Sequence, residues 1–172
     1  MLQRDQLWWD RHFLGVAKAV SKASKDPSTK IGAIIVRPDR SEVSWGYNGF
    51  PKGIADTPER LNDRPTKYKL VIHAEENAIF KKREDVTGCT IYVWPLFSCD
   101  RCAKAIISNG IIRIVSPPPD LARWQSSYDE AQALYREAGV QFDFVTGEND
   151  EAMKPELLPE AREWRKKLGL DK

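Results

Sequence analysis

The chain has 172 residues, which is enough for one globular domain with a sizeable core but hardly for two. Its 27 basic and 25 acidic side chains give a net charge of +2, so no global positive charge indicates a nucleic-acid partner. Three cysteines are too few for a disulfide framework. The sequence shows neither the apolar core of a signal peptide nor an apolar run of ~20 residues, so we expect a cytoplasmic protein without a membrane partner.

The first part of the chain predicts a helix, a hairpin and a long loop. Apolar residues recur at helical spacing from Trp9 onwards, which indicates an amphipathic helix that ends near Asp26. Residues 31–36 and 42–47 are rich in strand-forming side chains and flank a short polar turn, as the strands of a β-hairpin do. Residues 48–68 are rich in glycine, proline and charge, and loops of this length are usually functional.

Farther along the chain, predicted helices and strands alternate. Helical patterns cover residues 73–84, 102–109 and 126–139, and strand patterns cover residues 90–94, 111–116 and 140–145. Because this alternation implies parallel pairing, we expect an α/β fold: a three-layer α/β/α sandwich around a mixed, largely parallel five-stranded sheet. This domain takes up residues 1–146, and residues 147–172 form a C-terminal extension that we expect to be helical.

The pair Cys99 and Cys102 marks a candidate site, although by itself it fits a zinc site, a redox pair or two structural residues. His73 lies at the start of one predicted helix, and the two cysteines lie at the start of the next. Helix starts that follow neighbouring parallel strands emerge side by side at one edge of the sheet, where open α/β sheets bind ligands. One imidazole and two thiolates would meet there, and three protein ligands plus a water are the arrangement of catalytic zinc.

Glu75 gives this site a chemical use. It follows His73 by two residues, so it can face a metal-bound water without ligating the metal. Zinc lowers the pKa of such a water from about 15.7 to about 7, and a carboxylate can then carry its proton to a substrate. The combination H-x-E with C-x-x-C is the signature of zinc-dependent nucleobase deaminases. We expect Asp100 and Arg101 only to begin the helix between the cysteines, and Cys89 to be a small buried residue.

Four stretches make a closer resemblance: SKDPSTKIGAIIV at 24–36, GYNGFPKG at 46–53, HAEENAI at 73–79 and CDRCAKAIISNGI at 99–111. On these stretches the chain resembles the deoxycytidylate (dCMP) deaminases of the cytidine deaminase superfamily, over residues 8–146. The resemblance implies the cytidine deaminase-like fold and the hydrolysis of dCMP to dUMP and ammonia, which supplies dUMP for dTMP synthesis. It also implies a free nucleotide substrate rather than a nucleic acid.

The resemblance assigns roles to particular residues. Glu75 would be the catalytic proton carrier, and one Zn²⁺ ion per chain would be bound by His73, Cys99 and Cys102. The backbone N–H of Ala74 would face the pyrimidine carbonyl, and Asn48 would contact the sugar hydroxyl. Ser28 would hold the 5′-phosphate, with Lys25 or Lys30 nearby. Asn48 before Gly49 also suits a turn, and the lysines also suit solvated surface charges.

The resemblance further implies regulation and assembly. Members of the family are typically homohexamers that are activated by dCTP with Mg²⁺ and inhibited by dTTP. The GYNG stretch and the loop after it form the effector site of the family, so Asn48 and Gly49 are also candidate effector contacts.

The chain departs from the family directly before the first cysteine. The family usually has a proline there, but this chain has Ser98, and its proline stands at position 95. A proline would fix the backbone that enters the helix, whereas Ser98 can serve as the N-cap. We expect the zinc ligands to survive this change. The shortage of further cysteines and histidines argues against a second, structural zinc site.

Other functions fit parts of the pattern. A deaminase of tRNA or DNA bases, or of free nucleosides, shares the zinc ligands, but a strand-binding enzyme needs a basic and aromatic track that the small net charge does not favour. A zinc-stabilised binding module would have no use for Glu75. A thioredoxin-like redox protein has a C-x-x-C pair but needs no upstream histidine.

Overall fold

The computed structural model describes residues 4–119 and 121–145. The helices are α1 (Gln6–Ser21), α2 (Pro58–Asn62), α3 (Arg64–Leu70), α4 (Ala74–Lys81), α5 (Asp100–Ser108) and α6 (Leu121–Ala138). The strands are β1 (Gly32–Val36), β2 (Glu42–Tyr47), β3 (Thr90–Trp94), β4 (Arg113–Ser116) and β5 (Gln141–Phe144). The extension expected at residues 147–172 lies outside the described residues. Within them, every helix is too short or too polar to cross a membrane.

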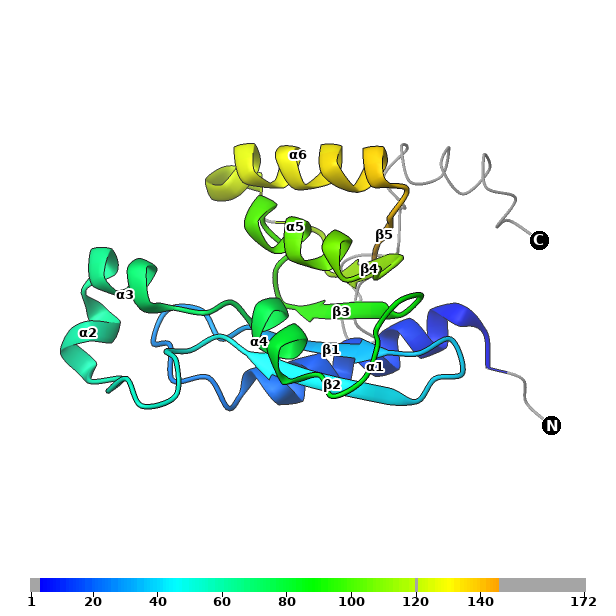
Figure 1. Ribbon diagram of the computed structural model, residues 1–172. Coiled ribbons are helices and arrows are strands. Elements are labelled where there is room, and N and C mark those ends of the chain that lie inside the picture. Colours follow the sequence, from blue (N-terminus) through cyan, green and yellow to red (C-terminus); the bar gives the residue numbers. More distant parts are fainter. Residues whose placement is uncertain (1–3, 120, 146–172) are drawn as a thin grey trace.

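The strands form one sheet in the order β2-β1-β3-β4-β5 (Figure 1). β1 pairs antiparallel with both β2 and β3, whereas β3 with β4 and β4 with β5 are parallel. β1 alone therefore runs against the other strands. The mixed, largely parallel five-stranded sheet predicted from the sequence is confirmed.

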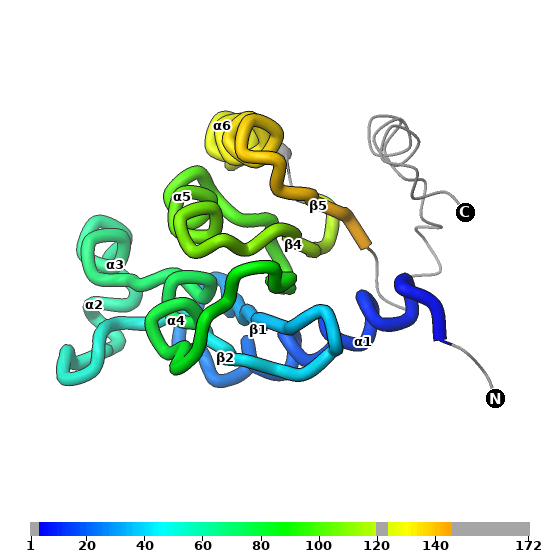
Figure 2. Tube along the Cα trace, turned by 45° about the vertical axis from the view of Figure 1, so that its right-hand side comes forward, coloured from blue at the N-terminus to red at the C-terminus, as the bar shows by residue number. Residues whose placement is uncertain are grey.

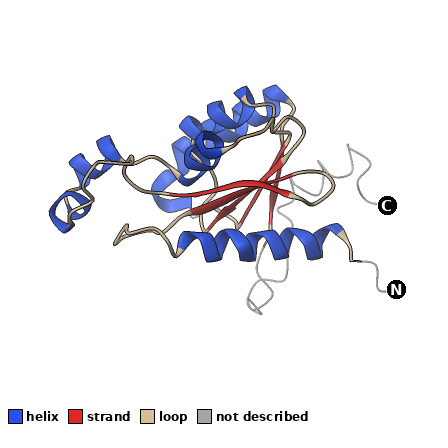
Figure 3. Ribbon diagram, turned by 60° about the horizontal axis from the view of Figure 1, so that its bottom comes forward, coloured by secondary structure: helices blue, strands red, loops and turns tan. Residues whose placement is uncertain are grey.

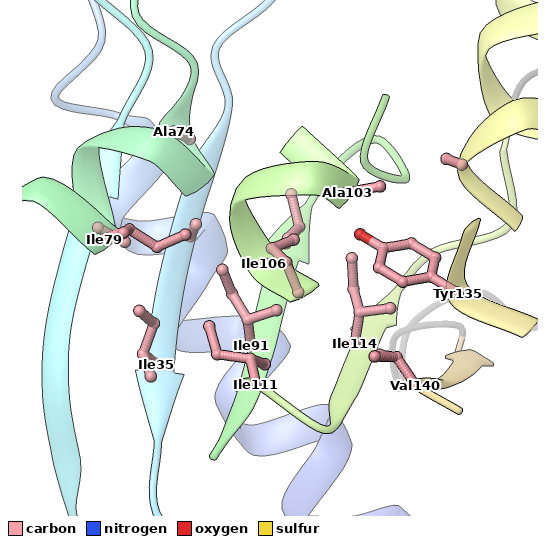
Figure 4. Close-up of a cluster of buried hydrophobic side chains, with 14 of the residues drawn as sticks. Ile35, Ala74, Ile79, Ile91, Ala103, Ile106, Ile111, Ile114, Tyr135 and Val140 are labelled. Atoms are coloured by element: carbon pink, nitrogen blue, oxygen red, sulfur yellow. The ribbon is translucent and has the colours of Figure 1, made fainter. Parts of the chain in front are cut away.

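Helices cover both faces of this sheet, which gives the three expected layers (Figure 3). On one face, Phe13 of α1 packs in a cluster with Ile34 of β1. On the other face, α4, α5 and α6 pack over Ile35, Ile91 and Ile114 (Figure 4). Successive side chains of a strand point to opposite faces, so Ile34 and Ile35 enter different cores. All residues of β1 are buried as a result.

The first helix ends earlier than predicted, at Ser21 rather than near Asp26. The hydroxyl of Ser21 donates to the carbonyl of Lys18 at 2.7 Å. The carboxylate of Asp26 then accepts hydrogen bonds from the backbone N–H groups of Ser28 at 2.7 Å and Thr29 at 3.1 Å. An aspartate that binds the backbone in this way favours a turn over a helix, so the segment after Ser21 becomes a loop.

The segment predicted as a loop at residues 48–68 contains two short helices instead. Thr57 caps α2 by accepting from the N–H of Arg60, and Asp63 caps α3 by accepting from the N–H of Thr66. A proline stands in the first turn of each helix, where its missing N–H costs nothing. Together α2 and α3 lie beyond one end of the sheet (Figure 1). The other predicted elements are present, with their ends shifted by up to five residues.

Gly46 lets α4 lie directly on β2. A Cβ atom at Gly46 would be 2.3 Å from the backbone nitrogen of Ala78 and 2.4 Å from the carbonyl oxygen of Ala74. Nδ2 of Asn77 also donates to the carbonyl of Tyr47 at 2.8 Å, which joins the same helix to the same strand. The close approach requires glycine at this position and fixes the N-terminus of α4 relative to the sheet.

One expectation about this arrangement is wrong. The strands that precede the helices expected to carry the zinc ligands, β2 and β3, are not neighbours, because β1 lies between them. Two strand spacings amount to about 10 Å, and two packed helices lie about 8–10 Å apart. The interposed strand therefore gives α4 and α5 the room to lie side by side on one face of the sheet (Figure 2).

Candidate active site

Two helices begin at predicted metal ligands. His73 comes directly before α4 and has an extended backbone, with φ −71° and ψ 158°. Cys99 comes directly before α5 with a similar backbone, φ −79° and ψ 169°, and Cys102 lies in the first turn of that helix. A helix N-terminus carries partial positive charge, which favours the thiolate form of a cysteine.

The three donor atoms lie close enough to share one metal ion. Nδ1 of His73 is 3.4 Å from Sγ of Cys99 and 3.3 Å from Sγ of Cys102, and all three atoms lie within 4.8 Å of one another. Tetrahedral zinc, with Zn–N about 2.1 Å and Zn–S about 2.3 Å, separates its ligand atoms by about 3.6 Å. The donor set therefore fits zinc. Among the described residues no further His, Cys or carboxylate joins the group, and three protein ligands are the catalytic arrangement.

The charges within this group are coupled. The pKa of the Cys99 thiol is lowered to about 4, chiefly by the hydrogen bond with Cys102 and also by His73. The pKa of His73 is raised to about 9, chiefly by the hydrogen bond with Cys99. The pKa of Cys102 is raised by its hydrogen bond with Cys99 and by burial. Because metal ligands must be deprotonated, binding of a zinc ion releases the protons that remain on the imidazole and on Cys102.

Glu75 lies beside these ligands in the first turn of α4. The residue is only 4% exposed, and it lines the same cleft as His73 and Cys99. Burial raises the pKa of Glu75 to about 7, and the charge of His73 opposes this rise. A carboxyl group with such a pKa can both accept and release a proton near neutral pH.

Charged side chains hold the two helix starts together. Glu76 accepts hydrogen bonds from the backbone N–H of His73 at 3.2 Å and from Nε of Arg101 at 2.7 Å. Asp100 accepts a hydrogen bond from the hydroxyl of Ser127 at 2.8 Å, which joins α5 to α6. The expectation that Asp100 and Arg101 only begin a helix is therefore wrong, because they tie α5 to its neighbours.

A cleft of about 290 Å³ opens beside His73 and Cys99. Its volume is close to the lower end of the usual range for small-molecule sites, about 300–1,000 Å³. The aromatic part of its lining consists of Phe97 and Tyr128, which are buried, and of Tyr68 and Trp124, which are 48% and 39% exposed. Flat apolar side chains of this kind suit a planar ring as ligand.

Lys67 is a buried cation in this cleft, and it is not among the residues predicted from the sequence. It is 5% exposed, and its Nζ donates to Oδ1 of Asp26 at 3.1 Å and to the hydroxyl of Ser28 at 3.3 Å. Arg64, on the same helix α3, also lines the cleft, as do Asp26 and Ser28. Two cations against one carboxylate leave this part of the cleft positively charged, which favours an anionic group in the ligand.

The residues predicted to contact a substrate differ in their placement. Ser28 and Asn48 line the cleft. The side chain of Asn48 also shapes the loop before β1, because Oδ1 accepts from the N–H of Ile31 at 2.8 Å and Nδ2 donates to the carbonyl of Thr29 at 3.0 Å. Ala74 is fully buried as the first residue of α4, and the first N–H groups of a helix have no partner within it.

Lys25 and Gly49 do not line this cleft. They border a smaller cavity of about 120 Å³, whose wall shares Asn48 with the cleft. Nζ of Lys25 forms an ion pair with Asp56 at 3.0 Å, and its side chain is 70% exposed. Lys30 is exposed and borders neither space. The lysine beside Ser28 therefore comes from α3 and not from the loop after α1.

Known proteins similar to this chain are deaminases. The family described as "Cytidine and deoxycytidylate deaminase zinc-binding region" matches residues 7–116. A protein of Aliivibrio fischeri, named as an uncharacterized deaminase in the luxG 3′ region, is 39% identical over 140 residues, which are 80% of this chain and 93% of that protein. The deoxycytidylate deaminase of Homo sapiens is 42% identical over 147 residues, which are 80% of each chain.

A solved structure shares the fold. The crystal structure of dCMP deaminase from the cyanophage S-TIM5, in complex with dCMP and dUMP, has a TM-score of 0.65 and 20% identity to this chain. The match covers 84% of this chain and 100% of the phage protein. The likeness shows that the expected cytidine deaminase-like fold is present.

Proposed function

This chain belongs to the cytidine and deoxycytidylate deaminase family, and from this membership we propose that it hydrolyses dCMP to dUMP and ammonia. The observation that carries the proposal is a single cleft that holds Glu75 beside the zinc donors and, in another part of its lining, the cations Lys67 and Arg64. Curated relatives named deoxycytidylate deaminase, from mouse and human, support the choice of substrate. Such a reaction supplies dUMP for dTMP synthesis.

His73, Cys99 and Cys102 hold the zinc ion in this proposal. When bound, zinc supplies the Lewis acidity that makes water a nucleophile at neutral pH. The hydrogen bond from the backbone N–H of His73 to Glu76 keeps the imidazole at the start of α4. The two sulfur donors come from Cys99, the N-cap of α5, and from Cys102 in the first turn of that helix.

Glu75 moves the protons. Its carboxylate accepts a proton from the water that adds to C4 of cytosine and passes this proton to N3 of the ring. It then carries the second proton of the same oxygen to the amino nitrogen, the C4–N bond breaks and ammonia leaves. The oxygen stays on C4 as the carbonyl of uracil. Burial of Glu75 suits both transfers, because a pKa of about 7 lets the group accept and release a proton with little free-energy cost.

We assign the 5′-phosphate to the positively charged part of the cleft. Lys67 has three N–H donors and uses two of them on Asp26 and Ser28, so one remains for a phosphate oxygen. Arg64 and the hydroxyl of Ser28 are the further phosphate contacts in this proposal. Lys25 is a weaker candidate than Lys67, because it is paired outside the cleft.

The base and the sugar are assigned to the residues implied by the family resemblance. The backbone N–H of Ala74 faces the pyrimidine carbonyl, and Asn48 contacts the sugar hydroxyl. Asn48 is supported by its place in the cleft lining, and Ala74 by its place between His73 and Glu75, which both line the cleft.

Ammonia release from dCMP, CMP, dCTP and deoxycytidine tests this proposal. We expect the highest kcat/KM on dCMP, about 100-fold above that on deoxycytidine, because two hydrogen bonds to a charged group contribute about 1.5 kcal/mol each. Equal activity on deoxycytidine would contradict the proposed substrate. A zinc-loaded protein that released no ammonia from any of the four would contradict the proposed chemistry.

Regulation, assembly and location are separate proposals. Asn48 and Gly49 border the smaller cavity, which shares a wall with the cleft, so a ligand there is placed to influence substrate binding. Its volume of about 120 Å³ is below the usual size of a ligand site, so dCTP with Mg²⁺ or dTTP requires the surrounding loop to open. Kinetics on dCMP that are hyperbolic and unchanged by both triphosphates would remove this proposal. The homohexamer and the cytoplasmic location stay predictions, which sedimentation and cell fractionation test.

A further inference from the structure

A buried hydrogen bond lies directly before the zinc-ligand cysteines. The hydroxyl oxygens of Ser98 and Tyr135 are 2.5 Å apart, and both residues are 0% exposed. Ser98 comes directly before Cys99, which is the N-cap of α5, so the expectation that Ser98 caps this helix is wrong. Tyr135 belongs to α6. The hydroxyl of Tyr135 points from α6 toward α5 (Figure 4). The proposed reaction uses neither side chain.

This hydrogen bond holds the entry to α5 from outside the metal group. The ring of Phe97 also contacts the ring of Tyr135 edge to face, with 5.9 Å between the ring centroids. Two consecutive residues before Cys99 are therefore held by one side chain of α6. Burial keeps the pKa of Tyr135 well above its usual value, so the phenol is neutral and can donate. A buried hydroxyl that loses its partner is costly to the folded protein, so each group holds the other in place.

We propose that Ser98 and Tyr135 are positioning residues of the zinc site, and that their hydrogen bond fixes the backbone from which Cys99 and Cys102 reach the metal. In the deaminase signature a proline precedes the first cysteine, and its ring fixes the backbone directly. Ser98 lacks that restraint, and its hydrogen bond with Tyr135 of α6 restrains the backbone instead. The proposal rests on the zinc site of the proposed function but not on the identity of the nucleotide.

Zinc release into an excess of the chelating dye 4-(2-pyridylazo)resorcinol, without any nucleotide, tests this role. We expect Ser98→Ala and Tyr135→Phe each to release zinc about tenfold faster than the unaltered protein, as is usual when an outer hydrogen bond to a metal site is lost. The double variant S98A/Y135F should be no faster than either single variant, because both substitutions remove the same hydrogen bond. Ser98→Pro combined with Tyr135→Phe should slow the release again, because the proline ring restrains the backbone and no hydroxyl is left unpaired.

Tyr92→Phe is the matched control. Tyr92 is also a buried phenol, 2% exposed, and it donates to Asp10 at 2.9 Å on the opposite face of the sheet. Its loss should lower the melting temperature without changing zinc release. The proposal is overturned if Tyr135→Phe changes the release rate no more than Tyr92→Phe does, or if S98P/Y135F releases zinc as fast as S98A/Y135F. If the zinc-release experiment contradicts the role of Ser98 and Tyr135, the measurement of ammonia release from dCMP is unaffected. The positioning role and the proposed deaminase activity are therefore tested separately.

Discussion

Glu75 and Lys67 are the two residues whose burial matters most for the proposed reaction. Both are charged side chains with at most 5% exposure in the lining of one cleft. A buried charge is tolerated only with partners, and the two residues differ in this respect. Lys67 is paired with Asp26, whereas burial raises the pKa of Glu75 to about 7. Lys67 is therefore suited to holding a charge, and Glu75 is suited to exchanging a proton.

Glu75→Gln should remove activity and leave the metal in place. Glutamine keeps the shape of the side chain but cannot carry a proton, and loss of general acid–base catalysis lowers kcat by at least about 100-fold. Ammonia release gives the rate, and elemental analysis gives the zinc content. Glu59→Gln, an exposed carboxylate on α2, is the control and should change neither. Retained turnover, or loss of zinc together with turnover, would contradict the role given to Glu75.

Lys67→Met should weaken the binding of a nucleotide more than that of a nucleoside. We expect KM for dCMP to rise about tenfold or more, because a hydrogen bond to a charged group contributes about 1.5–3 kcal/mol. The rate on deoxycytidine should change little. Lys69→Met, an exposed lysine of the same helix, is the matched control, and a melting curve shows whether Asp26 without its partner has destabilised the fold. An equal loss on both substrates would show that Lys67 does not contact the phosphate.

The grouping of His73, Cys99 and Cys102 could be predicted from the sequence, and the place of Lys67 could not, for a physical reason. His73, Cys99 and Cys102 lie at the starts of helices, where local spacing decides which side chains share an edge of the sheet. Lys67 meets Asp26 only through the fold, since no periodicity relates a residue of α3 to the loop after α1. The family resemblance implies Lys25 or Lys30 as the lysine near Ser28, yet the side chain of Lys25 pairs with Asp56.

The geometry of the site depends on where α4 and α5 begin. His73 precedes α4 and Cys99 precedes α5, so any movement of either helix moves a ligand. The position of α4 depends on Gly46, where the helix backbone approaches β2 too closely for a side chain. The close packing at Gly46 thus affects the geometry of the group formed by His73, Cys99 and Cys102.

Gly46→Ala should destabilise the fold and loosen zinc. The added methyl group would lie 2.3–2.7 Å from three backbone atoms of α4, so the helix must move, and overpacking of this kind costs about 1–3 kcal/mol. Thermal unfolding and zinc release into a chelator measure the two effects. Gly15→Ala is the control, since nothing lies within 4 Å of a Cβ atom there and alanine favours the helix α1. A variant Gly46→Ala as stable as Gly15→Ala would contradict the argument.

Much of the fold follows from local patterns, and the rest depends on packing. The hairpin and the alternation after it were predictable because each element carries its own periodicity. Thr57 and Asp63, each with a proline soon after it, are typical of helix starts and could have predicted α2 and α3 from the sequence. The place of β1 between β2 and β3 had no such signal, because strand order is decided by which faces the helices cover.

One polar network joins α1 to β3, β4 and β5. Arg113 of β4 donates from Nη1 and Nη2 to the two oxygens of Asp10, at 2.8 and 2.7 Å, and from Nε to Asp143 of β5 at 2.7 Å. Tyr92 donates to Asp10 as well. The network joins the first helix to the last strand, and it lies on the face of the sheet opposite to α4 and α5.

Arg113→Met should therefore lower stability without changing the site. It leaves two buried carboxylates without their cation, which costs about 3–5 kcal/mol and lowers the melting temperature by about 10 °C. Calorimetry measures this change, and KM for dCMP at a temperature well below the transition should stay the same. Arg136→Met removes an exposed arginine and should have almost no effect. A melting temperature as high as that of Arg136→Met would show that the network contributes nothing.

The two halves of the cleft come from different stretches of chain. The groups that react in the proposed function stand at the starts of α4 and α5, whereas the positive charge comes from α3, which lies between β2 and α4 in the chain. In this proposal, the chemistry and the main cationic contacts to the phosphate therefore come from separate segments of the chain. Replacing residues 55–70 with the corresponding stretch of a relative is a direct route to chimeric enzymes with a new preference and the same hydrolysis, and evolution has the same route open to it.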